Sequence, residues 1–269
     1  MSSEDTGSPP ERLRDEFLRL LETQQREQVY QAFMERHTQL VPHEFVQNHG
    51  IHFDLVLRKL AFGADYKSDF FYMSKSSDDW NLVFVEIEKP QSRYFRDNSN
   101  DLHRDFQKAL EQIGRWRAWL SEPSNLASLL VQLAPMHVPL TMRRNPSFPK
   151  FVLVHGRRGE YHDSDVRRSI VRAQEQADFK ILSFDSLVEG LSRKHECYIG
   201  VRHNEFIKIL SDRIISPEIF GWVDPAEFKV SKALRAEIAL GNPGGATIMV
   251  MDQGKPVNAL PLFAQKVRV

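Results

Sequence analysis

Residues 83–90 read VFVEIEKP and set three charged residues at the end of an apolar, β-branched run. Such a run predicts a buried strand. Pro90 cannot donate to a sheet ladder, so the strand ends there. Removing an ion from water costs several kcal/mol unless a partner offsets it. These charges therefore either face solvent at the strand end or hold a ligand.

Composition says little about partners. The 269 residues include 36 basic and 36 acidic side chains, so overall charge neither favours nor excludes nucleic acid. The lone Cys197 excludes an internal disulfide and a cysteine-based zinc site, and fits a reducing compartment. Residues 1–11 lack the apolar core of a signal peptide, and the most apolar window, residues 126–140, is too interrupted to span a membrane. We expect a cytoplasmic protein with no membrane association.

The first 190 residues alternate between helical and strand-like patterns. Residues 10–37 predict two surface helices. A β-meander is expected next, over residues 53–62, 68–73 and 81–88. A helix should then open at Asp101 or Asp105 and end near Leu120, with one apolar face on the sheet. Residues 135–149 form a connector, and a strand, helix and parallel strand follow at 151–154, 164–177 and 180–184.

The last part of the chain is harder to interpret. We expect helices at residues 204–215 and 226–240, and a hairpin after the break GNPGG. The predicted organisation is a polar tail with N-terminal helices over residues 1–40, an α/β core over 41–190, and a helical and hairpin appendage over 191–269.

Three carboxylates are expected to converge on the meander. If the strands at 68–73 and 81–88 form a hairpin centred near Ser77 and Asp78, Asp69 lies opposite Glu86, with Cβ atoms roughly 4.5 to 5.5 Å apart. Alternation places Glu88 on the same side as Glu86. Like charges this close repel unless a cation lies between them, and Mg²⁺ or Mn²⁺ suits oxygen ligands. The alternative is a different register, in which Asp69 caps a strand and the glutamates face solvent.

These elements resemble the core of PD-(D/E)XK nucleases, which is a restriction-endonuclease-like α/β fold with a mixed central sheet flanked by helices. The matching motifs are Asp69, the run EIE at 86–88, and a helix carrying Gln112 and Trp116. More narrowly, QVYQAFMERHTQLVP, SDFFYM, LVFVEIEKPQ, QKALEQIGRWRAWL, FVLVHGRRG and ILSFDSLVEGL resemble the Shedu anti-phage defence family in their order, over roughly residues 28–191.

The resemblance implies a bacterial, cytoplasmic DNA nuclease that acts as a homo-oligomer such as a tetramer. Asp69 and Glu86 would bind the metal, helped by the main-chain carbonyl of Ile87. The position usually held by lysine is Glu88, which we expect to act as general base or second-metal ligand. On strict alternation Lys89 points to the opposite face and reaches the site only if the strand twists or bulges just before Pro90. Lys89 and Lys108 are alternative electrostatic stabilisers.

Further candidate residues come from the neighbouring helices and strand ends. Gln112 would hydrogen-bond the nucleophilic water, the backbone or a phosphate, or else it is only a polar residue at a helix margin. Arg157 and Arg158 follow a buried strand, where ligands tend to bind, and are expected to contact DNA phosphates. The remaining candidates are Glu27 or Glu35 as an additional acid, and Arg167, Arg168 and Arg172 along the DNA backbone.

Three functions are consistent with this pattern. The first is a metal-dependent endonuclease or nickase. The second is a nuclease-fold module that binds DNA or a phage component without cutting, because lysine is missing at position 88. The third is a structural oligomer whose carboxylates are surface groups. The sequence has no GxxxxGK loop, HExxH or GxSxG motif, so it gives no support to other catalytic classes.

Overall fold

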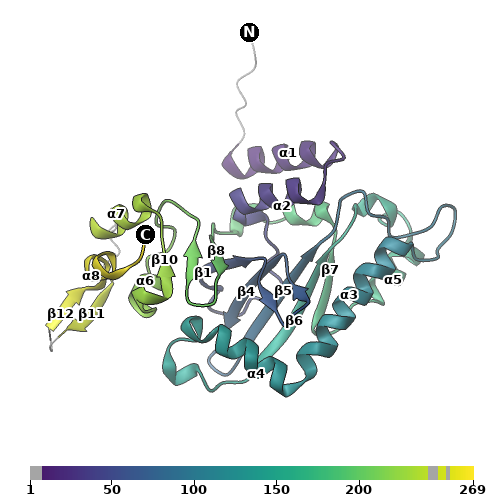
Figure 1. The fold of residues 1–269 in the computed structure, drawn as a ribbon. Coiled ribbons are helices and arrows are strands. Elements are labelled where there is room, and N and C mark those ends of the chain that lie inside the picture. The colour runs from purple at the N-terminus through teal and green to yellow at the C-terminus, as the bar shows by residue number, and fades with distance from the viewer. Residues whose placement is uncertain (1–7, 242–247, 253–254) are drawn as a thin grey trace, which may run out of the picture. The chain divides into compact units, whose positions relative to one another are not determined.

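A mixed eight-stranded sheet organises the fold, and helices flank it (Figure 1). The computed structural model describes residues 8–241, 248–252 and 255–269. The strand order is β10-β9-β8-β1-β4-β5-β6-β7. The strands are β1 (Ile51–Arg58), β4 (Phe70–Lys75), β5 (Trp80–Ile87), β6 (Ser147–Val154), β7 (Phe179–Leu182), β8 (Tyr198–Arg202), β9 (Ile207–Ile209) and β10 (Phe228–Lys229). The predicted neighbours β1, β4 and β5 are confirmed.

The chain divides into two compact units. The first contains Met1–Glu44, Val83–Trp119 and Pro149–His195, and the second contains Phe45–Leu82, Leu120–Phe148 and Glu196–Val269. The helices are α1 (Pro9–Leu21), α2 (Glu27–Arg36), α3 (Arg104–Ser121), α4 (Pro123–Gln132), α5 (Asp165–Arg172), α6 (Ile219–Trp222), α7 (Lys232–Ala239) and α8 (Ala259–Lys266). Among the described residues, no helix is both long and apolar enough to cross a bilayer.

In the first unit, aromatic side chains join the two N-terminal helices. Ser8 and Glu11 form a capping box, and Pro9 occupies the first turn, which fixes the start of α1. Phe17 of α1 stacks on Phe33 of α2, with ring centroids 5.6 Å apart. Both predicted N-terminal helices are thus confirmed, and their shared apolar face is buried.

Helix α3 covers strands β6 and β7 of the same unit (Figure 1). Its buried side chains recur at helical spacing: Phe106, Ala109, Ile113, Trp116 and Leu120. Strands β6 and β7 pair in parallel from Phe151 and Phe179 to Val154 and Leu182, and α5 lies between them in sequence. The predicted strand, helix, parallel strand crossover is therefore confirmed.

In the second unit, β1 lies between β4 and β8. β1 pairs antiparallel with β4 and parallel with β8, and its register shifts between Ile51 and Val56. Phe53 and Asp54 have positive φ at this irregularity. Such a bulge bends a strand. Two-residue strands β2 (Ala61–Phe62) and β3 (Tyr66–Lys67) form a separate small hairpin between β1 and β4.

Two predictions for the C-terminal part need correction. The helix expected at residues 204–215 is wrong, because strand β9 occupies Ile207–Ile209 and pairs with β8. Ile207 and Ile209 are buried and Lys208 between them is exposed, which is the period of a strand. Of residues 226–240, only Lys232–Ala239 is an α-helix, and Phe228–Lys229 is strand β10.

The predicted C-terminal hairpin is confirmed. Strands β11 (Met249–Asp252) and β12 (Lys255–Asn258) pair antiparallel, while residues 242–247 and 253–254 lie outside the described part of the chain. Phe220 of α6, Phe228 of β10 and Phe263 of α8 form an aromatic cluster that packs these elements together.

Candidate functional site

Glu86 lies near the end of β5, in the first unit. Its neighbours Val85 and Ile87 are buried, whereas Glu86 itself is half-buried. Gln112 projects from the middle of α3, and its Nε2 donates a hydrogen bond to Glu86 Oε1 at 2.5 Å. The amide therefore fixes the orientation of a carboxylate at the end of a buried strand. Two of the predicted site residues are brought together by this contact.

Glu88 and Lys89 leave the strand in different environments. The Glu88 N–H donates to the carbonyl of Val154 on β6 at 2.8 Å, and the Glu88 side chain is half-buried. Lys89 is exposed, and its carbonyl accepts from the N–H groups of Ser92 and Gly156 at 3.0 and 3.3 Å. The backbone of Lys89 thus closes the turn at Pro90, while its ammonium group is solvated.

Asp69 belongs to the second unit, directly before β4, and is only 4% exposed. Lys59, the residue after β1, pairs through its Nζ with Asp69 Oδ1. The backbones pair as well: the Lys59 N–H donates to the Asp69 carbonyl at 2.9 Å, and the Ser68 N–H donates to the Leu60 carbonyl at 3.0 Å. Lys59 was not among the predicted site residues, although it forms a basic pair with Arg58, the last residue of β1.

The expected opposition of Asp69 and Glu86 stays a prediction, because the two residues lie in different units. Within the described chain, no group of three or more His, Cys, Asp or Glu side chains is placed to hold a metal ion. A preformed three-acid cluster is therefore not seen. The donor chemistry still fits Mg²⁺, which often takes only one or two carboxylates with water as its remaining ligands. In the structure, Asp69 already accepts one cationic group, the Lys59 ammonium.

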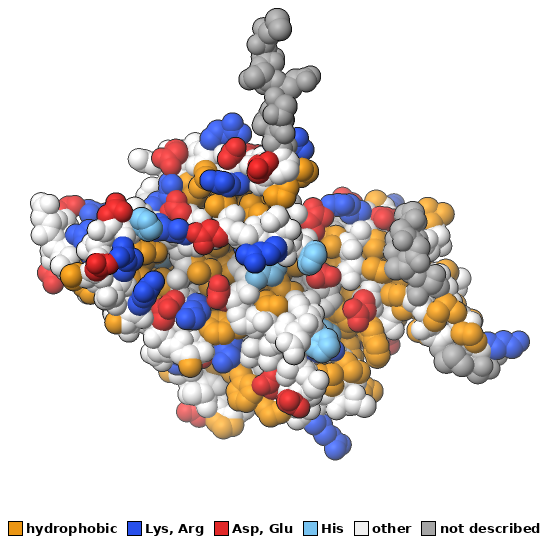
Figure 2. Space-filling model, turned by 180° about the vertical axis from the view of Figure 1, so that it is seen from behind, with side chains coloured by type: hydrophobic (Ala, Val, Ile, Leu, Met, Phe, Trp, Pro, Cys, Tyr) orange, Lys and Arg blue, Asp and Glu red, His pale blue; other side chains and the backbone are white. Residues whose placement is uncertain are grey.

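Arg157 and Arg158 are held in ion pairs. The Arg157 Nε donates to Asp185 Oδ1 and its Nη1 to Glu22 Oε1, both at 2.9 Å. Arg158 pairs with Glu189, and its N–H donates to Asp185 Oδ2 at 2.7 Å. To contact DNA phosphates, these guanidinium groups would have to exchange their carboxylate partners. On the described face in Figure 2, basic and acidic side chains are likewise interspersed.

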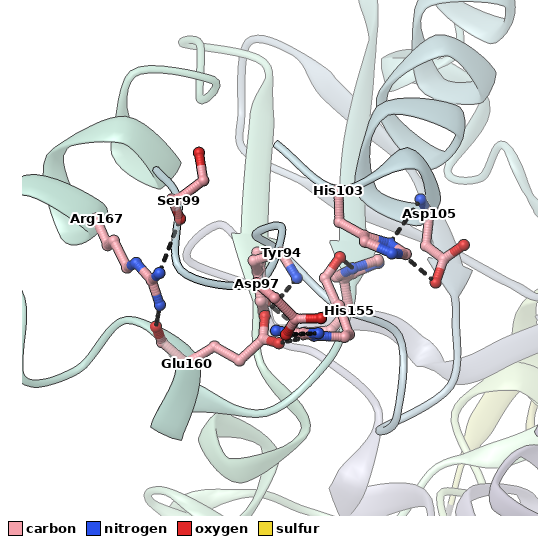
Figure 3. Close-up of polar contacts among 9 residues, drawn as sticks. Tyr94, Asp97, Ser99, His103, Asp105, His155, Glu160 and Arg167 are labelled. Carbon is pink, nitrogen blue, oxygen red and sulfur yellow. Dashed lines mark hydrogen bonds and ion pairs between the residues drawn. The ribbon is translucent and has the colours of Figure 1, made fainter. Parts of the chain in front are cut away.

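A polar network fixes the segment between Pro90 and α3 (Figure 3). Glu160 accepts from Arg93 Nε at 2.9 Å and from the Tyr94 N–H at 2.5 Å. The Tyr94 hydroxyl donates to the His155 carbonyl, and His155 Nε2 lies 3.2 Å from the Arg93 carbonyl. His155 is fully buried, and burial lowers its pKa to about 4. The segment that follows Glu88 is therefore rigidly tied to the end of β6.

Arg167 belongs to the same network and has a structural role. Its Nη1 donates to the Glu160 carbonyl at 3.0 Å and its Nη2 to the Ser99 carbonyl at 2.8 Å (Figure 3). Its guanidinium carbon lies 4.8 Å from the centroid of the Phe95 ring. Arg168 pairs with Asp165. Arg167 and Arg168 are half-buried, whereas Arg172 of the same predicted helix is exposed.

Helix α2 of the first unit carries several polar side chains and contacts the segment that follows Pro90. Glu27 and Glu35 are half-buried. Gln31 between them is 5% exposed, and its Nε2 has no hydrogen-bond partner among the described residues. Tyr30 is buried, and its hydroxyl accepts from Gln91 Nε2 at 2.9 Å. This contact links α2 to the residue after Pro90. The role of Glu27 or Glu35 as an additional acid stays a prediction.

The family model of the Shedu protein SduA, C-terminal, matches residues 24–188, which is more than half of the chain. The chain belongs to the Shedu SduA C-terminal family. None of the curated proteins searched matches it. The family region begins just before α2 and ends at residue 188, after β7, so it contains Lys59, Asp69, Glu86, Glu88, Gln112 and both arginines after β6. Its limits agree closely with the resemblance seen over residues 28–191.

Proposed function

We propose that this Shedu-family protein is a metal-dependent DNA endonuclease of the PD-(D/E)XK type, which nicks or cleaves phosphodiester bonds in defence against phage. The hydrogen bond from Gln112 to Glu86 carries the proposal. It places a helix amide against an acid at the end of a buried strand, inside the region that the family model matches. This is the arrangement that the proposed site requires.

Asp69, Glu86 and the Ile87 carbonyl are the groups proposed to hold Mg²⁺ or Mn²⁺. A bound divalent ion would polarise the scissile phosphate and make water a better nucleophile at neutral pH. Gln112 keeps the Glu86 carboxylate in one orientation. Glu88 accepts the proton that the attacking water gives up, as that water's oxygen bonds to phosphorus and one bridging P–O bond breaks.

A second candidate is a module that binds DNA or a phage component without cutting. Glu88 favours it, because the family pattern has lysine there. In that case the protein should bind DNA with an affinity that falls steeply with salt, since bound phosphates release counterions. In both cases the proposed partners are DNA and further copies of the same chain.

Conversion of supercoiled plasmid to nicked or linear forms tests the proposal. The wild type should convert plasmid with Mg²⁺ or Mn²⁺ and stop when EDTA is added. Glu86→Gln keeps the shape of the side chain and removes its charge, and it should reduce the rate at least about 100-fold. An equal rate in the Glu86→Gln variant would sink the proposal. Salt-dependent binding without any cutting by the wild type would establish the second candidate.

Helix α3 offers a matched pair of variants for the same assay. Gln112→Leu removes the amide that contacts Glu86, whereas Gln107→Leu alters an exposed residue of the same helix. We expect Gln112→Leu to lower the nicking rate roughly 10- to 100-fold, because a misplaced catalytic group of this kind costs about that much. Gln107→Leu should stay within about twofold of wild type.

A further inference from the structure

Lys59 has an unusual backbone for its residue type. It follows β1 with a φ of +50°, the left-handed region that favours glycine. The hydrogen bonds of its own N–H to Asp69 and of the Ser68 N–H to Leu60 hold it there. Strained non-glycine residues persist only where their surroundings over-determine them, and they cluster at functional sites. The strain is therefore a reason to ask what the Lys59 side chain does.

The Lys59 ammonium group pairs with a carboxylate that has almost no contact with water. The Asp69 side chain is 5% exposed, while the Lys59 side chain is 40% exposed. The lysine thus reaches from the surface to a buried acid, and one side of its charge still faces solvent. In an ordinary surface ion pair, both side chains are exposed to water. The Lys59–Asp69 pair differs because its carboxylate is buried.

We infer that Lys59 is the lysine of the proposed nuclease site, supplied by the end of β1 instead of by position 88. The inference rests on the proposed function, in which Asp69 holds the metal. Before a metal ion binds, the Lys59 ammonium group neutralises the charge of Asp69. With a divalent ion bound at that carboxylate, Lys59 would donate its N–H groups to a non-bridging oxygen of the scissile phosphate, where negative charge increases during the reaction. Lys59 forms no covalent bond.

The other lysines near the motif fit this role less well. Lys89 is exposed, and its carbonyl is tied to the turn after β5. Lys108 is exposed on α3, one turn before Gln112. Neither has an ion pair to a predicted metal ligand among the contacts of the described residues. Lys59 has one.

Two variants of Lys59 test the inference, with Lys67→Met as the control because Lys67 is exposed on β3 two residues before Asp69. Lys59→Met removes the charge and keeps the length. Lys59→Gly also removes the charge and relieves the positive φ, so it folds even if methionine is not tolerated there. Single-turnover nicking should fall at least about 10-fold in both Lys59 variants and stay within about twofold in the control.

Binding of Mn²⁺ to the protein without DNA gives a second readout. Because the ammonium group competes with the ion for Asp69, both Lys59 variants should bind Mn²⁺ at least about threefold more tightly than wild type in calorimetry. Added methylammonium should restore part of the nicking rate of Lys59→Gly. If the wild type nicks and both Lys59 variants nick as fast, Lys59 is only structural and the inference is overturned while the proposed function survives. If the wild type fails to nick with either metal, the proposed function falls, and the inference with it.

Discussion

Gly156, the residue after His155, is held in a conformation and a space that only glycine fits. Its φ is +54°, and a Cβ atom would lie 2.5 Å from the Ser92 carbonyl oxygen and 2.8 Å from Cε2 of Tyr94. We predict that Gly156→Ala lowers the free energy of unfolding by at least about 2 kcal/mol, because strain and a backbone clash add together. Urea denaturation of the purified variant measures this loss.

Gly159 supplies the control for that experiment. It lies three residues further along, and a Cβ atom there would meet nothing within 4 Å. Gly159→Ala should therefore change stability by no more than about 0.5 kcal/mol. Equal urea midpoints for the two alanine variants would show that the close approach of the 88–94 segment to Gly156 is not present in solution.

Single residues of the site were predictable to different degrees. Gln112 was singled out through the family resemblance, whereas the apolar stripe of its helix alone predicted only a polar residue at the helix margin. Lys59 was missed because the register of a hairpin predicts only the positions of residues that alternate along its strands. It lies just beyond a strand end and is directed by a positive φ, which no hydrophobic pattern reports.

At the scale of elements, Arg117 anchors α3 to the start of β7. Its Nε and Nη2 donate to the two carboxylate oxygens of Asp178 at 3.0 and 2.9 Å, and its guanidinium carbon lies 5.7 Å from the centroid of the Phe151 ring. Both side chains are about one-third exposed. We predict that Arg117→Ala costs about 1–2 kcal/mol in chemical denaturation, since a two-bond, charge-assisted contact is lost.

The same helix carries a suitable comparison for Arg117. Arg115 is 56% exposed and approaches Glu111 only to 4.0 Å, one turn earlier. Exposed pairs of this kind contribute a few tenths of a kcal/mol. Arg115→Ala should therefore be nearly neutral. If the two alanine variants were equally stable, α3 would not depend on its contact with Asp178.

The elements themselves were predicted well where a pattern was long and regular. The two N-terminal helices, the meander strands, α3 and the β6–β7 crossover all follow from periods of 3.6 or 2. The helix expected at residues 204–215 was wrong because β9 has only three residues, Ile207–Ile209, which is too short for its alternation to stand out. Whether such a short segment forms a strand depends on the strands with which it pairs. The periodicity of its own residues does not reveal those partners.

At the scale of the whole molecule, both units hold neutral histidines, of which His43 is half-buried and the other three are buried. His43 and His155 lie in the first unit and His52 and His137 in the second. Burial lowers the pKa of His52 to about 3 and that of the other three to about 4, from an ordinary value of 6.5. Between these values and pH 6.5 the unfolded chain binds more protons than the folded one. Stability is thus complete above pH 6.5 and is lost as the pH falls towards 4.

We predict that each of these histidines contributes about 2 kcal/mol of lost stability between pH 7 and pH 5, so that the protein unfolds in mild acid. Chemical denaturation at the two pH values measures the loss, with hydrogen exchange to follow each unit separately. His155→Gln, which cannot take up a proton, should shrink the pH-dependent loss by about 2 kcal/mol, whatever it does to stability at pH 7. Replacing the exposed His162 in the same way should leave the loss unchanged. An identical pH dependence in the two variants would mean that His155 is not buried in its neutral form.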